Sequence, residues 1–183
     1  MKTNESLVKY VLRLAGTLFL ITFVVAAALA GVNSITAPKI EQLTYEKTQE
    51  AVSAVLPGGG DTVDFTDETG LVLEVYQGEA GYAVKVAPVG FDSAVTMMVG
   101  VDFDGNVLGI SVIDHSETAG LGAVAAASTS AGEAFRGQFV GMSGTVSVTK
   151  DGGEVEAITG ATITSRAVCV GVNAALECVG NMG

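Results

Sequence analysis

The stretch EAITGATITSRAV, residues 156–168, decides the fold of the C-terminal part of the chain, because a turn of small residues leads directly into a helical pattern. We predict a helix from about Ser165 to Val179. Gly160 and Ala161 carry almost no side chain, so their backbone N–H groups can approach a ligand closely. A helix start favours an anion, and hydroxyl groups surround this one on Thr159, Thr162, Thr164 and Ser165. By spacing alone, a bound phosphate and an ordinary turn with a helix cap both remain open.

A second turn-rich segment, HSETAGLG at residues 115–122, follows an apolar run that is typical of a strand. We expect the two turn-rich segments to form two walls of one site. Gly120 and Gly122 are expected where the backbone conformation or a close approach excludes larger residues. His115 lies at the strand end without a partner motif, so we interpret it as structural rather than catalytic.

The remaining pattern predicts an α+β fold. Four β-like runs are expected to form an antiparallel meander, with Asp104-Gly105 as the last hairpin turn. These runs are LVLEVY (71–76), YAVKVAP (82–88), AVTMMVGVDF (94–103) and NVLGISVID (106–114). We also predict a short helix around residues 132–139 and a further strand at residues 145–149.

An uncharged apolar segment lies near the N-terminus, at residues 14–37. It is long enough to cross about 30 Å of hydrocarbon as one helix. Cations precede it at Lys2, Lys9 and Arg13, opposed by Glu5, so the positive-inside rule places the N-terminus in the cytoplasm and the rest of the chain outside it. A cleaved signal peptide is the alternative, because Ala28-Leu29-Ala30-Gly31 resembles a cleavage site. An amphipathic helix from Lys39 to Leu56, stopped by Pro57 and the glycines after it, is expected to connect this anchor to the domain.

Composition excludes several classes of function. From residue 14 onward the chain has 6 basic and 19 acidic residues, so binding to a phosphate backbone, and hence to nucleic acid, is electrostatically disfavoured. Cys169 and Cys178 lie nine residues apart in the predicted last helix and therefore point to nearly opposite faces, so we expect no disulfide. No Cys-x-x-Cys or His/Cys cluster occurs in the sequence, which predicts no metal site and leaves redox chemistry to an organic cofactor.

Taken together, the two turn-rich segments resemble the FMN-binding domain of the Rnf complex G subunits and of the related C subunits of the sodium-pumping NADH:quinone oxidoreductase. Those families carry an Asp-x-x-(Ser/Thr)-Gly-Ala-Thr motif, which residues 156–162 match as EAITGAT. They also carry His-x-Glu-Thr-Pro-Gly-Leu-Gly, which residues 115–122 match except at Ala119. Glu156 stands at the position of the motif's aspartate, which puts recognition by a flavin transferase in question.

The resemblance implies covalent FMN, joined by a phosphoester to Thr162 and installed by a separate flavin transferase. It implies that the phosphate lies among Thr159, Gly160, Ala161, Thr164 and Ser165. It also implies that Glu117, Thr118 and Leu121 line the isoalloxazine ring, Leu121 by packing on its face and the polar pair by hydrogen bonds to its edge. Gly122 is expected in the same cofactor-binding site. A tethered flavin needs position and electrostatics from the protein rather than a catalytic base, so no catalytic residue is predicted.

The expected organisation is a cytoplasmic stub and transmembrane anchor (1–37), a connecting helix (38–60) and an extracytoplasmic FMN-binding domain (61–183). By resemblance, the chain relays electrons with the other membrane subunits of an Rnf-type ferredoxin:NAD+ oxidoreductase in the cell (inner) membrane, without independent catalysis. Three alternatives remain open: a subunit of a sodium-translocating NADH:quinone reductase, an extracellular flavin electron-transfer or sensor module, and a non-redox anchored scaffold.

Overall fold

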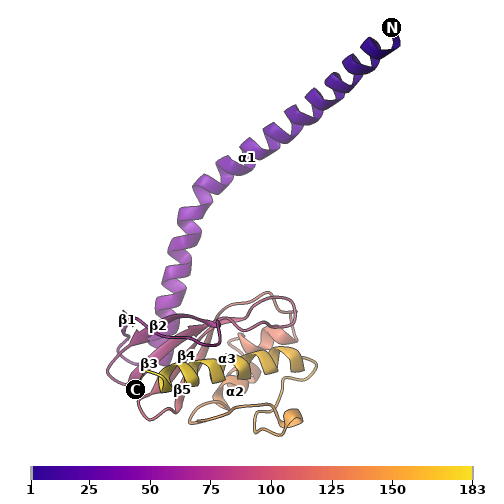
Figure 1. Cartoon of the computed structure of the whole chain (residues 1–183). Helices are drawn as coiled ribbons and strands as arrows, with labels where there is room; N and C mark the ends of the chain where they lie inside the picture. The colour runs from indigo at the N-terminus through magenta and orange to yellow at the C-terminus, as the bar shows by residue number, and fades with distance from the viewer. Residues whose placement is uncertain (1, 183) are drawn as a thin grey trace. The chain divides into compact units, whose positions relative to one another are not determined.

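The computed structural model describes residues 2–182, with side chains from residue 8 onward. Its contacts divide the chain into two compact units that meet between Tyr45 and Glu46. The first unit contains most of helix α1 (Lys2–Val55), and the second contains the end of α1 and every other element (Figure 1). Lys2 and Glu5, which entered the charge argument for orientation, lie outside the residues whose side chains are described.

The first unit is an exposed apolar helix, long enough and apolar enough to cross a membrane. Four hydroxyl groups of its apolar segment are bonded inside the helix: Thr17, Thr22, Ser34 and Thr36 each donate to the carbonyl four residues earlier. A hydroxyl bonded in this way leaves no polar group unpaired in hydrocarbon. A second helix, α3 (Thr162–Gly180), passes the same test of length and composition, but most of it is buried, so it is the core helix of the domain.

The expected connecting helix is not a separate element, because α1 continues through Pro38 to Val55. It ends where predicted, at Pro57 and the positive-φ Gly58. Its last turns pack into the second unit, where Val52, Val55 and Leu56 are buried against the sheet. The second compact unit begins at Glu46.

The domain is built on a five-stranded antiparallel meander in the order β1-β2-β3-β4-β5, as the four apolar runs predicted. The predicted strands are β2 (Val72–Gln77), β3 (Gly81–Val86), β4 (Thr96–Asp102) and β5 (Val107–Asp114). Gly105 adopts φ +82° in the last hairpin, as a turn residue should. The edge strand β1 (Asp61–Val63) was not predicted, because three residues in an acidic loop carry no period.

Both faces of the sheet are covered. On one face, Val84, Val86, Met97 and Val99 pack against α3 and α2 (Ser130–Gly137); on the other, Ala83 and Met98 pack against the end of α1 (Figure 1). Successive strand residues point to opposite faces, so coverage on both sides explains why β3 and β4 are apolar almost without alternation.

The strand predicted at residues 145–149 is wrong. This segment forms only one bridge, between Val148 and Val155, and passes into the short 3₁₀ helix η2 (Thr149–Asp151). Val146 and Val148 are both buried in the core, which reproduces the alternation of a strand in an irregular loop. The loop is held instead by Asn173 of α3, whose side-chain amide accepts from the N–H of Val146 (2.7 Å) and donates to its carbonyl (2.9 Å).

An ion pair between the buried Lys85 and the partly exposed Glu74 fixes the end of α1 to the sheet. Lys85 is 8% exposed, and its Nζ lies 2.9 Å from Glu74 Oε1 and 3.4 Å from Thr48 Oγ1 of α1. The Tyr76 hydroxyl donates to the other oxygen of Glu74. Every polar atom of the cluster therefore has a partner, as buried charges require.

We expect Glu74→Ala to lower the free energy of unfolding of the full chain in detergent by about 1.5–3 kcal/mol, because it leaves the buried Lys85 charge without its partner. Urea unfolding followed by circular dichroism measures this change. Glu79→Ala removes the same charge from an exposed position and should have almost no effect. Equal unfolding midpoints for the two variants would contradict the assigned role of the pair.

Candidate functional site

The two turn-rich segments meet in one pocket of about 290 Å³. This is close to the lower end of the range for small-molecule sites, about 300–1,000 Å³. The loop after β5 forms one wall and the start of α3 forms the other, as expected. The lining residues are Phe91, Glu117, Thr118, Leu121, Gly122, Lys150, Gly160, Ala161, Thr162, Ile163 and Thr164.

The wall at α3 presents free backbone donors. Gly160 adopts φ +77°, and Ala161, as the residue that caps α3, provides no side-chain hydrogen bond. Among the described residues, no hydrogen bond from the N–H groups of Thr162, Ile163 or Thr164 is found. Unpaired N–H groups at a helix start attract an anion.

Two of the residues predicted to surround the phosphate, Thr159 and Ser165, do not line the pocket. The hydroxyl of Ser165 is fully buried, where it donates to the Ala161 carbonyl (2.9 Å) and accepts from the Ile158 N–H (3.0 Å). Ser165 therefore shapes the turn from behind. Thr159 is exposed and lies outside the lining.

The opposite wall contains a buried carboxylate, that of Glu117, which is 7% exposed. Its Oε1 accepts from the backbone N–H groups of Phe91 (2.8 Å) and Asp92 (3.2 Å), and its Oε2 accepts from the hydroxyl of Thr164. Burial by itself would raise the pKa of Glu117, but the hydrogen bonds from Thr164, Asp92 and Phe91 outweigh it and hold the pKa below its usual value. Glu117 and Thr164 thus satisfy each other, and together they join the two walls.

Small residues make room for this carboxylate. A Cβ at Gly90 or Gly122 would collide with the oxygens of Glu117, which explains the close approach predicted for Gly122. Gly120 has φ +76°, the conformational reason predicted for that position. His115 accepts a hydrogen bond from the Glu117 N–H at its Nδ1 (3.2 Å), so it also supports this loop.

The mouth of the pocket is apolar. Phe91 is 67% exposed, Ile163 50% and Leu121 41%, and the backbone of Gly160 lies so close to Leu121 that a Cβ there would come within 2.9 Å of Leu121 Cδ2. Large apolar side chains exposed around a pocket are typical of a ligand site. Phe91 and Ile163 were not predicted: Phe91 belongs to neither turn-rich segment, and Ile163 follows directly after the EAITGAT motif.

A lysine faces the threonine at the start of α3. Lys150 of η2 donates from Nζ to the Thr162 hydroxyl at 3.1 Å. The next residue, Asp151, is held to α3 by Arg166 through two hydrogen bonds of 2.6 and 2.7 Å. Lys150 was not predicted from the sequence; the available signal was a basic residue in a Gly-rich turn of a very acidic domain.

Glu156, which replaces the aspartate of the resembled motif, is exposed. Its backbone is fixed by the side chain of Gln138, which accepts from the Glu156 N–H (2.7 Å) and donates to its carbonyl (3.2 Å). Gln138 therefore holds the segment that leads to Thr162 through the N–H and the carbonyl of Glu156, while the Glu156 carboxylate is exposed.

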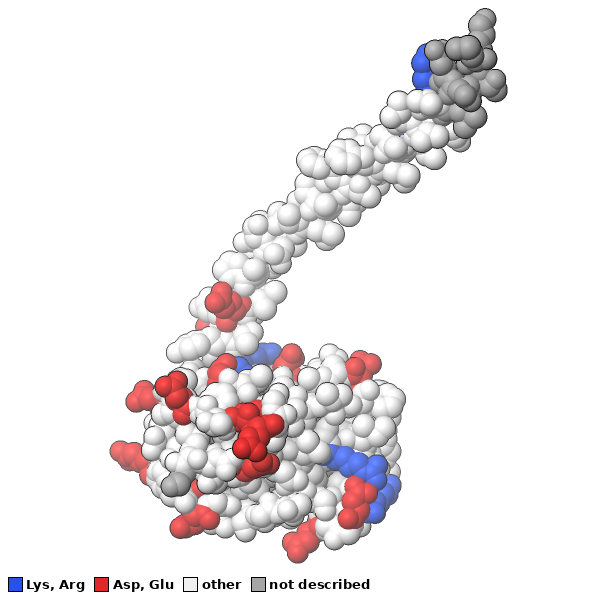
Figure 2. Space-filling view, in the orientation of Figure 1, with Lys and Arg blue, Asp and Glu red and all other residues white. Residues whose placement is uncertain are grey.

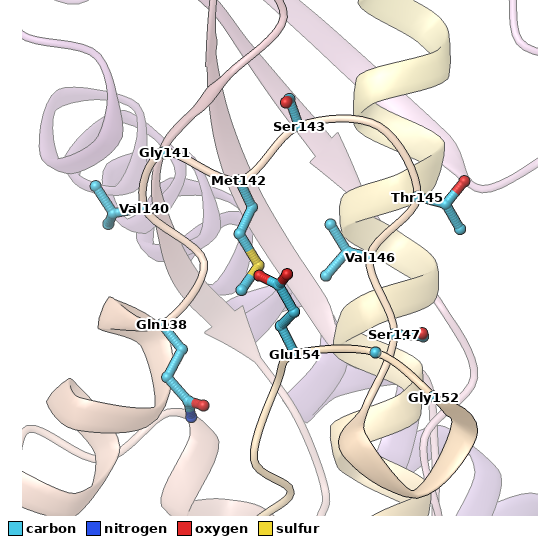
Figure 3. A pocket seen from close by; sticks show the side chains of 11 residues that line it. Gln138, Val140, Gly141, Met142, Ser143, Thr145, Val146, Ser147, Gly152 and Glu154 are labelled. Carbon is cyan, nitrogen blue, oxygen red and sulfur yellow. The ribbon is translucent and has the colours of Figure 1, made fainter.

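A larger cavity, of about 620 Å³, lies on the other side of the η2 turn. The loops at residues 138–147 and 152–154 line it, and Figure 3 shows Met142 and Glu154 pointing toward each other inside it. Its lining residues include neither turn-rich motif and no cation, so size alone does not make it the site.

The two cysteines of α3 are free and buried. Burial raises the pKa of Cys169 to about 11, so it remains a protonated thiol at neutral pH. The thiols therefore serve as small apolar groups in the core.

Comparison with known proteins gives consistent matches. Residues 90–177 match the FMN-binding domain family, and this range includes every residue that lines the smaller pocket. The chain is 36% identical to the G subunit of the Na(+)-translocating ferredoxin:NAD(+) oxidoreductase complex of Acetobacterium woodii, over 95% of this chain and 94% of the relative. It is 33% identical to the G subunit of the ion-translocating oxidoreductase complex of Methanosarcina acetivorans, over 93% and 95%.

Proposed function

Because the chain belongs to the family of G subunits of ion-translocating oxidoreductase complexes, we propose that it carries FMN covalently on Thr162 and relays electrons within such a complex. It is a flavoprotein electron-transfer subunit of an ion-translocating ferredoxin:NAD+ oxidoreductase. The observation that carries the covalent assignment is the position of the Thr162 hydroxyl, which lies in a pocket with unpaired N–H groups and an ammonium group beside it.

The residues present fit FMN at both of its ends. Its phosphate suits the N–H groups at the start of α3, near Gly160 and Ala161, because the helix dipole and free donors favour negative charge there. Its flat ring suits the apolar mouth formed by Phe91, Leu121 and Ile163. Thr118 is exposed in the pocket and offers its hydroxyl to the polar edge of the ring.

Glu117 acts through position rather than as a hydrogen-bond partner of the ring. Both of its oxygens already accept bonds from the protein. Thr164 and Ser165 likewise hold the start of α3 in place, because their hydroxyls are bonded to Glu117 and to Ala161. Bound FMN supplies one- and two-electron transfer; the chain supplies the rigid walls and the charge that keep it in one orientation.

The anchor supports a membrane location, and the cations before it support an N-terminus in the cytoplasm with the FMN domain outside. One spanning segment without an acidic residue at 14–37 is a poor path for an ion. We therefore assign ion translocation to the other membrane subunits, and installation of the flavin to a separate flavin transferase. No independent catalysis is proposed.

The sequence also allowed a sodium-translocating NADH:quinone reductase subunit, a free-standing flavin module and a non-redox scaffold. The comparisons favour a G subunit of an ion-translocating oxidoreductase complex over these alternatives, because the chain covers nearly the whole length of two G subunits. Co-purification of tagged chain from its native membrane separates the alternatives: the partners should be the other subunits of the ferredoxin:NAD+ oxidoreductase.

The proposal is tested by intact mass spectrometry of the full chain after co-expression with a flavin transferase. We expect an added mass equal to FMN less one water, and fragmentation should assign it to the peptide that contains Thr162. An unmodified chain under conditions in which a known substrate of the transferase is fully modified would overturn the covalent assignment and favour the scaffold.

A further inference from the structure

The start of α3 has a lysine beside it that forms no ion pair among the described residues. Its first turn contains no acidic residue, although the helix dipole favours one there. Lys150 lies beside it instead, and the other nearby cation, Arg166 of α3, is paired with Asp151. Positive charge at the positive end of a helix dipole is unfavourable by itself, so this arrangement calls for an anion.

Positive charge is scarce in this domain, so the position of each basic residue is informative. From Glu46 onward the chain has five basic residues. Lys85 is buried against Glu74, and Arg136 donates to the carbonyls of Ala125 and Ala127. On the face shown in Figure 2, the acidic side chains of the domain are scattered and the basic atoms gather in small groups.

Lys150 is held in position but its charge is not neutralised. Arg166 takes up both oxygens of Asp151, which fixes the η2 turn to α3 and thereby directs the adjacent Lys150 toward Thr162. Among the described residues, the ion pairs are Lys85 with Glu74 and Arg166 with Asp151, and neither includes Lys150. The hydroxyl of Thr162 is its hydrogen-bond partner, 3.1 Å away.

We propose that Lys150, directed by the Asp151–Arg166 pair, is the residue that neutralises the phosphate of the flavin on Thr162. This inference rests on the proposed function of the pocket. A phosphoester joined to Thr162 brings its negative charge next to the ammonium group that now contacts the hydroxyl, and a charge-assisted hydrogen bond between them is among the stronger ones in proteins. The same contact orients the hydroxyl before the ester forms.

The test compares Lys150→Met with Lys150→Arg, and uses Lys47→Met as the matched control, because Lys47 is an exposed lysine of α1 whose loss changes the net charge equally. Full chain in detergent is incubated with a flavin transferase and FAD, whose pyrophosphate bond is broken so that the FMN phosphoryl group joins the Thr162 oxygen and AMP and the hydroxyl proton leave. Covalent flavin is followed by its fluorescence after denaturation. We expect loading of Lys150→Met to be slower by roughly ten- to hundredfold, with Lys47→Met unchanged and Lys150→Arg at least partly restored.

A second measurement reports on the environment of the phosphate after loading, once the transferase has been removed. The phosphorus-31 resonance of the loaded chain should shift in Lys150→Met, shift less in Lys150→Arg and stay unchanged in Lys47→Met. The inference is wrong if Lys150→Met has the same rate of flavin loading and the same phosphorus-31 chemical shift as Lys47→Met. It is also wrong if Lys150→Arg restores neither the loading rate nor the chemical shift. A wild-type chain that takes up no flavin refutes the proposed function instead, so the two failures are distinguishable.

Discussion

We expect Thr162→Ala to abolish covalent flavin while the domain remains folded. The ester needs a hydroxyl, and alanine removes it. The side chain of Thr162 is half-buried and its hydroxyl has one partner in the structure, Lys150, so its loss leaves no buried polar group unpaired. We therefore expect complete loss of bound flavin after denaturation, with a change in the free energy of unfolding below about 0.5 kcal/mol, as for other surface substitutions.

Two variants sharpen this prediction. Thr162→Ser keeps a hydroxyl at the same place and should retain part or all of the flavin. Thr145→Ala removes an exposed threonine that lines the larger cavity, and should load as the wild type does. Covalent flavin on Thr162→Ala, or its loss in Thr145→Ala alone, would place the attachment elsewhere.

Glu117→Ala separates the two walls of the pocket. The substitution leaves the N–H groups of Phe91 and Asp92 and the hydroxyl of Thr164 without their acceptor. An unsatisfied buried group costs about 1–3 kcal/mol, so we expect a loss of about 3 kcal/mol in the free energy of unfolding, measured by urea unfolding. Covalent flavin should fall as well, because the start of α3 loses its link to the opposite wall.

Glu117→Gln distinguishes position from charge. Glutamine keeps one acceptor and nearly the same shape, so it should recover part of the stability lost in Glu117→Ala. Glu156→Gln is the matched control, because that carboxylate is exposed. If Glu117→Ala unfolds at the same urea concentration as Glu156→Gln, the carboxylate does not join the walls.

The same residue predicts a pH dependence. The pKa of Glu117 is lower in the folded domain than its usual value of 4.5. A lowered folded-state pKa contributes stability that is present above the unfolded-state pKa and is lost as the pH falls through the folded-state pKa. Below about pH 4.5 the wild type should therefore lose stability more steeply than Glu117→Gln. Parallel pH profiles for the two chains would contradict this assignment.

Local pattern predicted most of the fold. The meander, the short helix before η2 and the last helix each follow from the regular spacing of apolar residues along the chain. The segment at residues 145–149 shows where this fails: Val146 and Val148 alternate because both face the core, and no strand was available to pair with them. The last helix begins at Thr162, three residues before the predicted start, because Thr162 to Thr164 resemble turn residues as much as helix residues.

The sequence by itself determined the apolar anchor, the meander and the two turn-rich segments, because hydrophobic period and small-residue turns are properties of neighbours along the chain. Only the tertiary structure decided what surrounds Thr162. It brought Lys150 and Phe91 into the pocket from loops without a motif, and it made the carboxylate of Glu117 the link between two walls. The physical reason is that packing of α3 on the sheet sets which distant loops meet, and a hydrogen-bond partner exists only once they have met.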